Sequence, residues 1–297
     1  MRPRDWGLAL LVVIGWGLNF VVIRFALEEL PPLLLGALRF LVLAFPAILF
    51  IKPPPIAPRL LLAYGLLISF GQFALLFLAM HFGMPAGLAS LVLQSQMLFT
   101  LTFAAVFLGE QWRWHQLVAM LIAGSGLFLL ASQTAATQMT LLGFVLTIGA
   151  ASCWGAGNII NRIIAQKPGV PVMSLIVWGS LVPVLPFLIC SLLFEGPAAI
   201  GHSLAAAGWQ SVWTIAYLAL ISTLFGYGSW NYLMRHYPAS VVAPLSLLVP
   251  VVGLFSAWFI LGETLNLMQG LGILLILAGL AFNVFGPRLS RARGRRL

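Results

Sequence analysis

The chain has 297 residues, of which 62% are hydrophobic and only 7% charged, with a formal net charge of +9 at pH 7. A soluble domain carries about 25% charged residues, so this composition excludes a water-soluble fold and predicts an integral membrane protein. The positive charge does not indicate a nucleic-acid partner, because the basic residues stand in short segments between apolar runs and in the segment 288–297, where a membrane surface explains them better.

Ten apolar runs follow one another along the chain, most of them close to the ~20 residues that a helix needs to cross a bilayer. They span residues 6–26, 33–51, 60–80, 86–108, 117–131, 141–164, 172–194, 212–234, 241–261 and 268–285. The first run is longer than the apolar region of a signal peptide, about 7 to 15 residues, so we expect a permanent helix. Several prolines lie inside runs and are expected to kink their helices: Pro46, Pro183, Pro186, Pro244 and Pro250.

The second half of the chain repeats the first. The frame 85–110 recurs 153 positions later as 238–263, and Trp16 recurs 138 positions later as Trp154. Five helices per copy is an odd number, so the second copy must enter the membrane in the opposite direction. We therefore expect an all-α integral membrane protein with two inverted five-helix repeats around a central cavity. The expected boundaries are residues 1–135 for the first repeat, 136–287 for the second and 288–297 for a basic cytoplasmic tail.

The basic residues between the helices set the expected orientation. With a cytoplasmic N-terminus, nearly all lysines and arginines fall on the cytoplasmic side, and only Arg24 and Arg39 oppose this arrangement. The positive-inside rule then places both termini in the cytoplasm, Glu110 at the inner face and Glu263 at the outer face.

Polar side chains near the middle of a membrane helix need a partner or water, so they are candidates for a substrate path. With the aromatic residues beside them, these candidates are Trp16, Asn19, Gln72, Gln94, Trp154, Asn158, Tyr227, Trp230 and Ser246. Structural alternatives stay open for them: the asparagines can bond one helix to another, and Tyr227 and Trp230 can belong to an interfacial aromatic belt. Gln94 and Gln96 are two residues apart, so they are not expected to share a helix face.

Arg39 is the one basic residue well inside a predicted span. It stands about two turns from the outer end of its helix, where it can snorkel outwards or pair with Glu28 or Glu29. Alternatively, it attracts a substrate carboxylate in an outer vestibule and acts as a weak guide. The sequence leaves both interpretations open.

The remaining ionisable residues give no sign of catalysis. Glu110 and Glu263 stand just before the fifth and tenth helices, where we expect them to cap N–H groups. No Asp or Glu lies deep in a predicted span, the four histidines are scattered, and Cys153 and Cys190 form no CxxC pair. The sequence therefore predicts no enzyme activity, no catalytic or metal site and no cofactor.

Several segments together resemble the EamA family of the drug/metabolite transporter superfamily. They are WGLNF at 16–20, the stretch 31–40, GMPAGLAS at 83–90, LGE at 108–110 and APLSLLVP at 243–250. The resemblance covers nearly the whole chain and implies ten helices, both termini in the cytoplasm, and a cavity lined chiefly by helices one, three, four, six, eight and nine. Within the family, the chain most resembles bacterial inner-membrane exporters of O-acetylserine and cysteine.

The resemblance and the inverted repeat together imply an exporter of small metabolites that works by alternating access in the bacterial inner membrane. The expected substrates are amino acids of the cysteine pathway, O-acetylserine and cysteine, or other neutral amino acids. An exporter of lipophilic cations or drugs is the alternative, although it would normally need a buried carboxylate. A membrane scaffold that transports nothing would not explain the repeat. The expected partners are a small-molecule substrate and the lipid bilayer, not nucleic acid, with a monomer favoured and proton coupling left open.

Overall fold

The computed structural model describes residues 1–133 and 139–293. In these ranges every regular element is a helix, and ten helices are long and apolar enough to cross a membrane. These ten spans begin and end within a few residues of the ten apolar runs, so the predicted all-α membrane fold is confirmed. Part of the expected linker, residues 134–138, and the end of the basic tail, residues 294–297, lie outside the described residues.

Seven α-helices build the five spans of the first half. They are α1 (Pro3–Glu29), α2 (Pro32–Ala44), α3 (Pro58–Tyr64), α4 (Gln72–His81), α5 (Ala86–Val92), α6 (Gln96–Leu108) and α7 (Trp114–Ser132). Other helix types interrupt the spans: 3₁₀ turns at Ala47–Leu49 and Leu93–Ser95, and a π-helical stretch at Gly65–Gly71. Such π-helical segments are rare and occur frequently at functional sites.

Within the described residues, the second half also has five spans, with nine α-helices, of which α11 lies between two spans. Its α-helices are α8 (Leu141–Ala165), α9 (Val172–Leu181), α10 (Val184–Cys190), α11 (Pro197–Ala206), α12 (Trp209–Ala216), α13 (Gly226–His236), α14 (Ala239–Val242), α15 (Leu248–Leu261) and α16 (Leu267–Arg293). Ser191–Glu195 and Tyr217–Phe225 are π-helical, and Ala243–Leu247 is a 3₁₀ turn. α11 lies between the predicted apolar runs 172–194 and 212–234, and Pro197 starts it, because the fixed φ of proline suits a first helical turn.

The prolines inside the spans act in two ways. α2 ends before Pro46 and α9 ends before Pro183, so these two interrupt their helices as predicted. Pro186 and Pro250 instead lie in the first turns of α10 and α15. A first-turn N–H has no helical partner, so proline costs little there.

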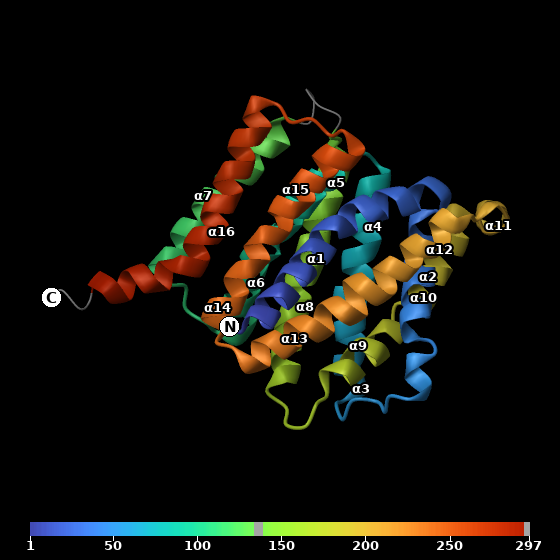
Figure 1. Ribbon diagram of the computed structural model, residues 1–297, viewed down its shortest axis with the longest axis horizontal. Coiled ribbons are helices and arrows are strands. Elements are labelled where there is room, and N and C mark those ends of the chain that lie inside the picture. Colours follow the sequence, from blue (N-terminus) through green and yellow to red (C-terminus); the bar gives the residue numbers. More distant parts are fainter. Residues whose placement is uncertain (134–138, 294–297) are drawn as a thin grey trace.

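The two halves of the chain are interleaved (Figure 1). α1 packs against α12, α13 and α15 of the second half, and α8 packs against α4 and α6 of the first. Gly17 permits the close approach of α1 and α15, because a Cβ there would collide with Val252. α7 and α16 lie side by side at one edge of the bundle (Figure 1). Helices of both halves therefore surround the middle of the bundle.

The ends of the bundle differ in packing. At one end, here called the closed end, α1 ends at Glu29, α2 begins at Pro32 and α5 begins at Ala86. Side chains at most 4% exposed fill this end, including Leu30, Leu33, Leu34, Met84 and Leu88. The opposite end, here called the open end, is where α8 and α13 finish, and a much smaller cluster of buried residues lies there: Ala9, Leu233 and Val242.

Candidate functional site

A cavity of about 400 Å³ lies in the middle of the bundle, within the ~300–1,000 Å³ typical of small-molecule sites. All ten residues proposed from the sequence line it: Trp16, Asn19, Arg39, Gln72, Gln94, Trp154, Asn158, Tyr227, Trp230 and Ser246. Both halves of the chain contribute to this lining. The structure thus brings the candidates together, whereas their binding of a substrate stays a prediction.

The cavity extends towards the open end of the bundle. Asn161 and Trp230, both near that end of their helices, line it, and Asn161 is exposed. Towards the closed end the cavity stops at Phe73 and Leu76, which are 7% and 1% exposed and belong to the main buried core. The structure is therefore sealed on one side of the cavity only.

Trp16 organises an aromatic wall of the cavity. Its indole Nε1 donates a hydrogen bond of 2.9 Å to the backbone carbonyl of Ser222. Its ring centroid lies 5.4 Å from that of Tyr227 and 5.3 Å from that of Trp230. Gly226 leaves room for the indole, because a Cβ at this position would collide with it. Tyr227 and Trp230 thus pack on Trp16 in the cavity wall, which favours the cavity over the aromatic-belt interpretation.

The asparagines of the two halves have different partners. Asn158 donates to Gln96 Oε1 at 2.7 Å and to Thr100 Oγ1 at 3.1 Å, so it bonds α8 to α6 while lining the cavity. Asn19 is 6% exposed, and its Oδ1 has no hydrogen-bond partner among the residues that the structure describes. The helix-bonding interpretation therefore fits Asn158 and leaves Asn19 free to meet a ligand.

Gln94 and Gln96 both line the cavity, so the expectation that they face different sides is wrong. The reason is the 3₁₀ turn Leu93–Ser95, which breaks the 3.6-residue periodicity between α5 and α6. Asn161 also lines the cavity and was missed. Its spacing of three residues from Asn158 on a predicted helix was the signal that could have found it.

Arg39 lies in the wall of the central cavity and is 1% exposed. Its Nη2 donates to Thr223 Oγ1 at 2.9 Å, and its guanidinium carbon lies 3.9 Å from the ring centroid of Phe73. The predicted snorkelling and the predicted pairing with Glu28 or Glu29 are therefore wrong, as is the outer-vestibule position. The physical reason is that Phe73 and the π-helical stretch containing Thr223 enclose the guanidinium from two sides.

Three carboxylates at the closed end join the two halves by capping helix N-termini. Glu263 accepts hydrogen bonds from the backbone N–H groups of Ala86 and Gly87 at 2.6 and 3.0 Å. Glu195 binds the first turn of α2 in the same way, with its two oxygens 2.6 and 3.0 Å from backbone nitrogens. Glu29 accepts from Ser211 N at 2.9 Å, near the start of α12. Each anion lies where the positive end of a helix dipole stabilises it.

The glutamates that end the two LGE motifs, Glu110 and Glu263, therefore do not act as predicted. Glu263 caps α5 of the other half and not the helix that follows it. Glu110, at the equivalent position of the first half, forms an ion pair of 2.5 Å with Arg162 near the open end, and both side chains are about half exposed (43% and 51%). Both glutamates lie at helix ends as predicted, but the groups that they bind depend on which helices the fold brings together.

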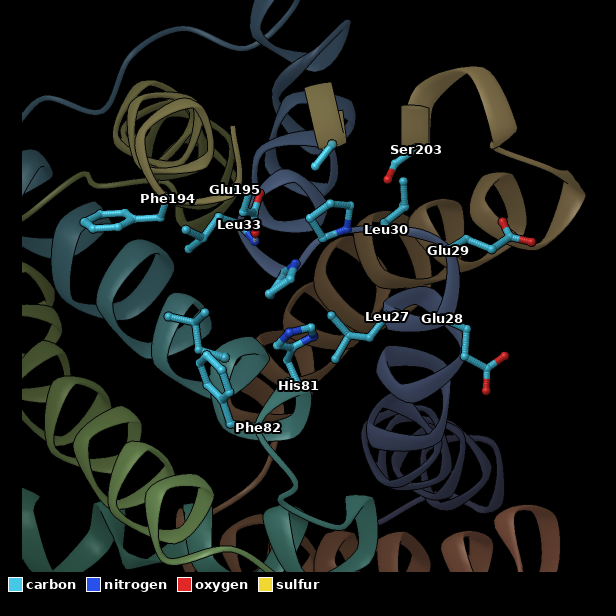
Figure 2. A pocket seen from close by; sticks show the side chains of 14 residues that line it. Leu27, Glu28, Glu29, Leu30, Leu33, His81, Phe82, Phe194, Glu195 and Ser203 are labelled. Carbon is cyan, nitrogen blue, oxygen red and sulfur yellow. Dashed lines mark hydrogen bonds between the residues drawn. The ribbon is translucent and has the colours of Figure 1, made fainter. Parts of the chain in front are cut away.

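A second pocket, of about 450 Å³, opens at the closed end and is shown in Figure 2. His81, Glu28, Glu29 and Glu195 are among its lining residues, and Glu195 lies beside Leu33, whose N–H it accepts. This pocket shares no lining residue with the central cavity. It is therefore a surface depression outside the seal, and its capping carboxylates serve the helix ends.

A contact at the open end holds the N-terminus in place. The Tyr237 hydroxyl donates to Asp5 at 2.5 Å and accepts from the backbone N–H of Arg2 at 3.3 Å. The hydrogen bond to Asp5 raises the pKa of Tyr237, because it stabilises the neutral phenol. Elsewhere in the described ranges, no group of three or more His, Cys, Asp or Glu side chains is placed to hold a metal ion.

The chain matches the EamA-like transporter family twice, over residues 6–132 and 141–285. Proteins described as probable amino-acid metabolite efflux pumps are 52% identical in Salmonella typhimurium and 48% identical in Escherichia coli, each over 98% of both chains. A solved crystal structure of a protein, 19% identical, covers 95% of this chain and 96% of its own with a TM-score of 0.64, a likeness of fold alone. The two family matches and the nearly full-length identities show that the chain belongs to the EamA-like transporter family.

Proposed function

We propose that the protein exports small amino-acid-like metabolites across the bacterial inner membrane by alternating access. The observation that carries this proposal is the central cavity, which side chains of both halves line and which is sealed at one end only. Internally repeated membrane helices around a site near the midplane are typical of transporters. The names of the Salmonella and Escherichia relatives described above, both probable amino-acid metabolite efflux pumps, support the substrate class.

The capping carboxylates support alternating access. Glu29, Glu195 and Glu263 each join one half of the chain to the other at the closed end, so releasing them would let the halves separate there. Glu110 stands at the position equivalent to Glu263, at the opposite end of the bundle. An inverted repeat supplies a gate at either end of the same cavity, and the two gates open in turn.

The proposed orientation follows from the basic residues. With both termini in the cytoplasm, the closed end faces the periplasm and the cavity reaches towards the cytoplasm, the side from which an exporter loads its substrate. In this arrangement residues 1–135 and 136–287 form the two repeats, and the tail 288–297 lies at the cytoplasmic membrane surface.

The lining of the cavity favours neutral or zwitterionic substrates. Amide, hydroxyl and aromatic side chains predominate, and no carboxylate is found among the lining residues that the structure describes. A carrier of lipophilic cations would need such a counter-charge, so this alternative is disfavoured. O-acetylserine, cysteine and other neutral amino acids fit better. The transporter acts without catalysis, cofactor or nucleic acid, and a monomer contains a complete cavity.

Transport by the purified protein in liposomes tests this proposal. A panel of labelled neutral amino acids, including cysteine and O-acetylserine, is compared with a lipophilic cation, each with and without a pH gradient. We expect saturable uptake of one or more amino acids and none of the cation. Uptake of the cation alone, or of no compound while the protein remains folded, would contradict the proposal. An effect of the pH gradient would indicate proton antiport.

A further inference from the structure

Three buried side chains of the cavity have unused hydrogen-bonding atoms. Nε and Nη1 of Arg39, Oδ1 of Asn19 and Oε1 of Gln72 have no partner within the part of the chain that the structure describes. These side chains are 1%, 6% and 2% exposed, and all three line the same cavity. Buried polar atoms are normally paired, so these atoms await partners from a ligand or from water in the cavity. Ser95 and Asn283 also carry unpaired atoms, but neither lines the cavity.

Arg39 is suited to bind a carboxylate. It is the one charged residue among the described lining residues, and a buried guanidinium without a counter-ion is strongly unfavourable. Its planar N–H groups match the two oxygens of a carboxylate, and such charge-assisted hydrogen bonds are stronger than neutral ones. A substrate carboxylate would therefore satisfy both the charge and the unused donors.

A purely structural role does not account for the free donors of Arg39. The ring of Phe73 interacts with the face of the guanidinium, and Thr223 accepts one hydrogen bond from Nη2. Neither contact uses the N–H groups at Nε and Nη1, which lie in the plane of the guanidinium. These donors remain directed to a partner that the described residues do not supply.

Asn19 and Gln72 supply the complementary chemistry. Their unpaired atoms are carbonyl oxygens, which accept hydrogen bonds from an ammonium group. Two such acceptors and a cation in the lining of one cavity can together bind a zwitterion, whose positive and negative groups are close together. The aromatic wall around Trp16 lies nearer the open end and is left for the side chain of the substrate.

We propose that Arg39, Asn19 and Gln72 form a subsite for the main-chain groups of a free α-amino acid. Arg39 binds the carboxylate, and the two amide oxygens accept from the ammonium. This inference rests on the proposed function and deepens it, because it restricts the substrates to compounds in which both groups are free. It also explains how the cavity takes an ammonium group without a carboxylate of its own.

Competition experiments on the wild-type protein in detergent test the subsite directly. The probe is labelled L-cysteine, or the amino acid that the transport panel identifies as best carried. The competitors are the unlabelled amino acid, its methyl ester and its N-acetyl derivative, which lack the negative or the positive group respectively. We expect both derivatives to bind at least 30-fold more weakly than the free amino acid. Equal competition by all three compounds would overturn the subsite while leaving amino-acid export intact.

Variants assign the roles of the individual residues. Arg39→Gln should lower the affinity for the free amino acid at least 30-fold and leave the affinity for the methyl ester unchanged. Gln72→Leu should instead reduce the preference for the free amino acid over its N-acetyl derivative, because only Asn19 then accepts from the ammonium. Arg24→Gln, which changes the net charge equally at an exposed site outside the cavity, is the control and should stay within twofold.

The outcomes separate the two proposals. Full retention of affinity and selectivity in folded Arg39→Gln overturns the inference alone. If Arg39→Gln does not fold, the competition by the methyl ester and the N-acetyl derivative on the wild-type protein decides. A folded wild-type protein that binds and carries no amino acid overturns both the subsite and the proposed function.

Discussion

Glu263→Gln should open the closed end, because Glu263 holds two backbone N–H groups of α5 across the two halves of the chain. Glutamine keeps one of the two side-chain oxygens, so one hydrogen bond to a charged acceptor is lost and the other becomes neutral. Hydrogen bonds to charged groups contribute about 1.5–3 kcal/mol each, and the site is partly exposed. A net loss of about 1.5–3 kcal/mol raises the fraction of molecules open at this end roughly 10- to 140-fold.

The matched control is Glu110→Gln, at the equivalent position of the other repeat. Its ion pair with Arg162 joins two side chains that are 43% and 51% exposed, and exposed ion pairs contribute about 0–1 kcal/mol. The expected change in the same population is therefore at most about fivefold. The two variants remove the same charge from equivalent positions of the two repeats, and they differ in what the carboxylate binds and in the end of the bundle where it lies.

The assay is the labelling rate of one cysteine by a membrane-impermeant thiol reagent added at the closed end. Ser90 is 1% exposed and lines the cavity on its closed side, so Ser90→Cys in a chain without Cys153 and Cys190 reports opening. Glu263→Gln should raise this rate at least tenfold. An unchanged rate, or an equal rise in Glu110→Gln, would refute the role of Glu263 as a gate.

Three further predictions concern stability and orientation. Asn158→Leu should lower the thermal stability in detergent, because it removes the hydrogen bonds to Gln96 and Thr100. Asn19→Leu should instead abolish transport at unchanged thermal stability. A parallel loss of transport and stability in Asn19→Leu would show that Asn19 is a packing residue. Below pH ~10 the hydrogen bond from Tyr237 to Asp5 is intact, and its stabilisation is lost as the pH rises through the raised pKa of Tyr237. Melting curves at increasing pH should therefore show a loss of stability in the wild-type protein at this pH, and no such loss in Tyr237→Phe. With both termini in the cytoplasm, Ser132→Cys should be labelled from the periplasm and Arg291→Cys should not; equal labelling would disprove the orientation.

Much of the fold could be predicted because the bilayer imposes one strong constraint. A run of about 20 apolar residues is expected to become a spanning helix, since a helix pairs its backbone groups within the same segment. The ten spans followed from this rule, and the candidate residues followed from the cost of placing polar groups in a membrane. Repeated positions such as Trp16 and Trp154 then indicated a shared cavity.

The remaining features depend on contacts between distant segments, which periodicity does not encode. The π-helical stretch Tyr217–Phe225 places Thr223 against Arg39, and the 3₁₀ turn Leu93–Ser95 turns Gln94 and Gln96 to one cavity. A regular 3.6-residue helix predicts neither arrangement. The partner of Glu263 was also missed, because α5 of the other half supplies its N–H groups.

Reciprocal labelling at the two ends of the cavity tests alternating access most directly. Ser90 is buried on the closed side, and Asn161 is exposed on the open side of the same cavity. Adding a transported amino acid should raise the labelling of Ser90→Cys from the closed end and lower the labelling of Asn161→Cys from the open end. If the two rates rise or fall together, or if neither responds to any transported amino acid, the protein does not expose one cavity to each side in turn.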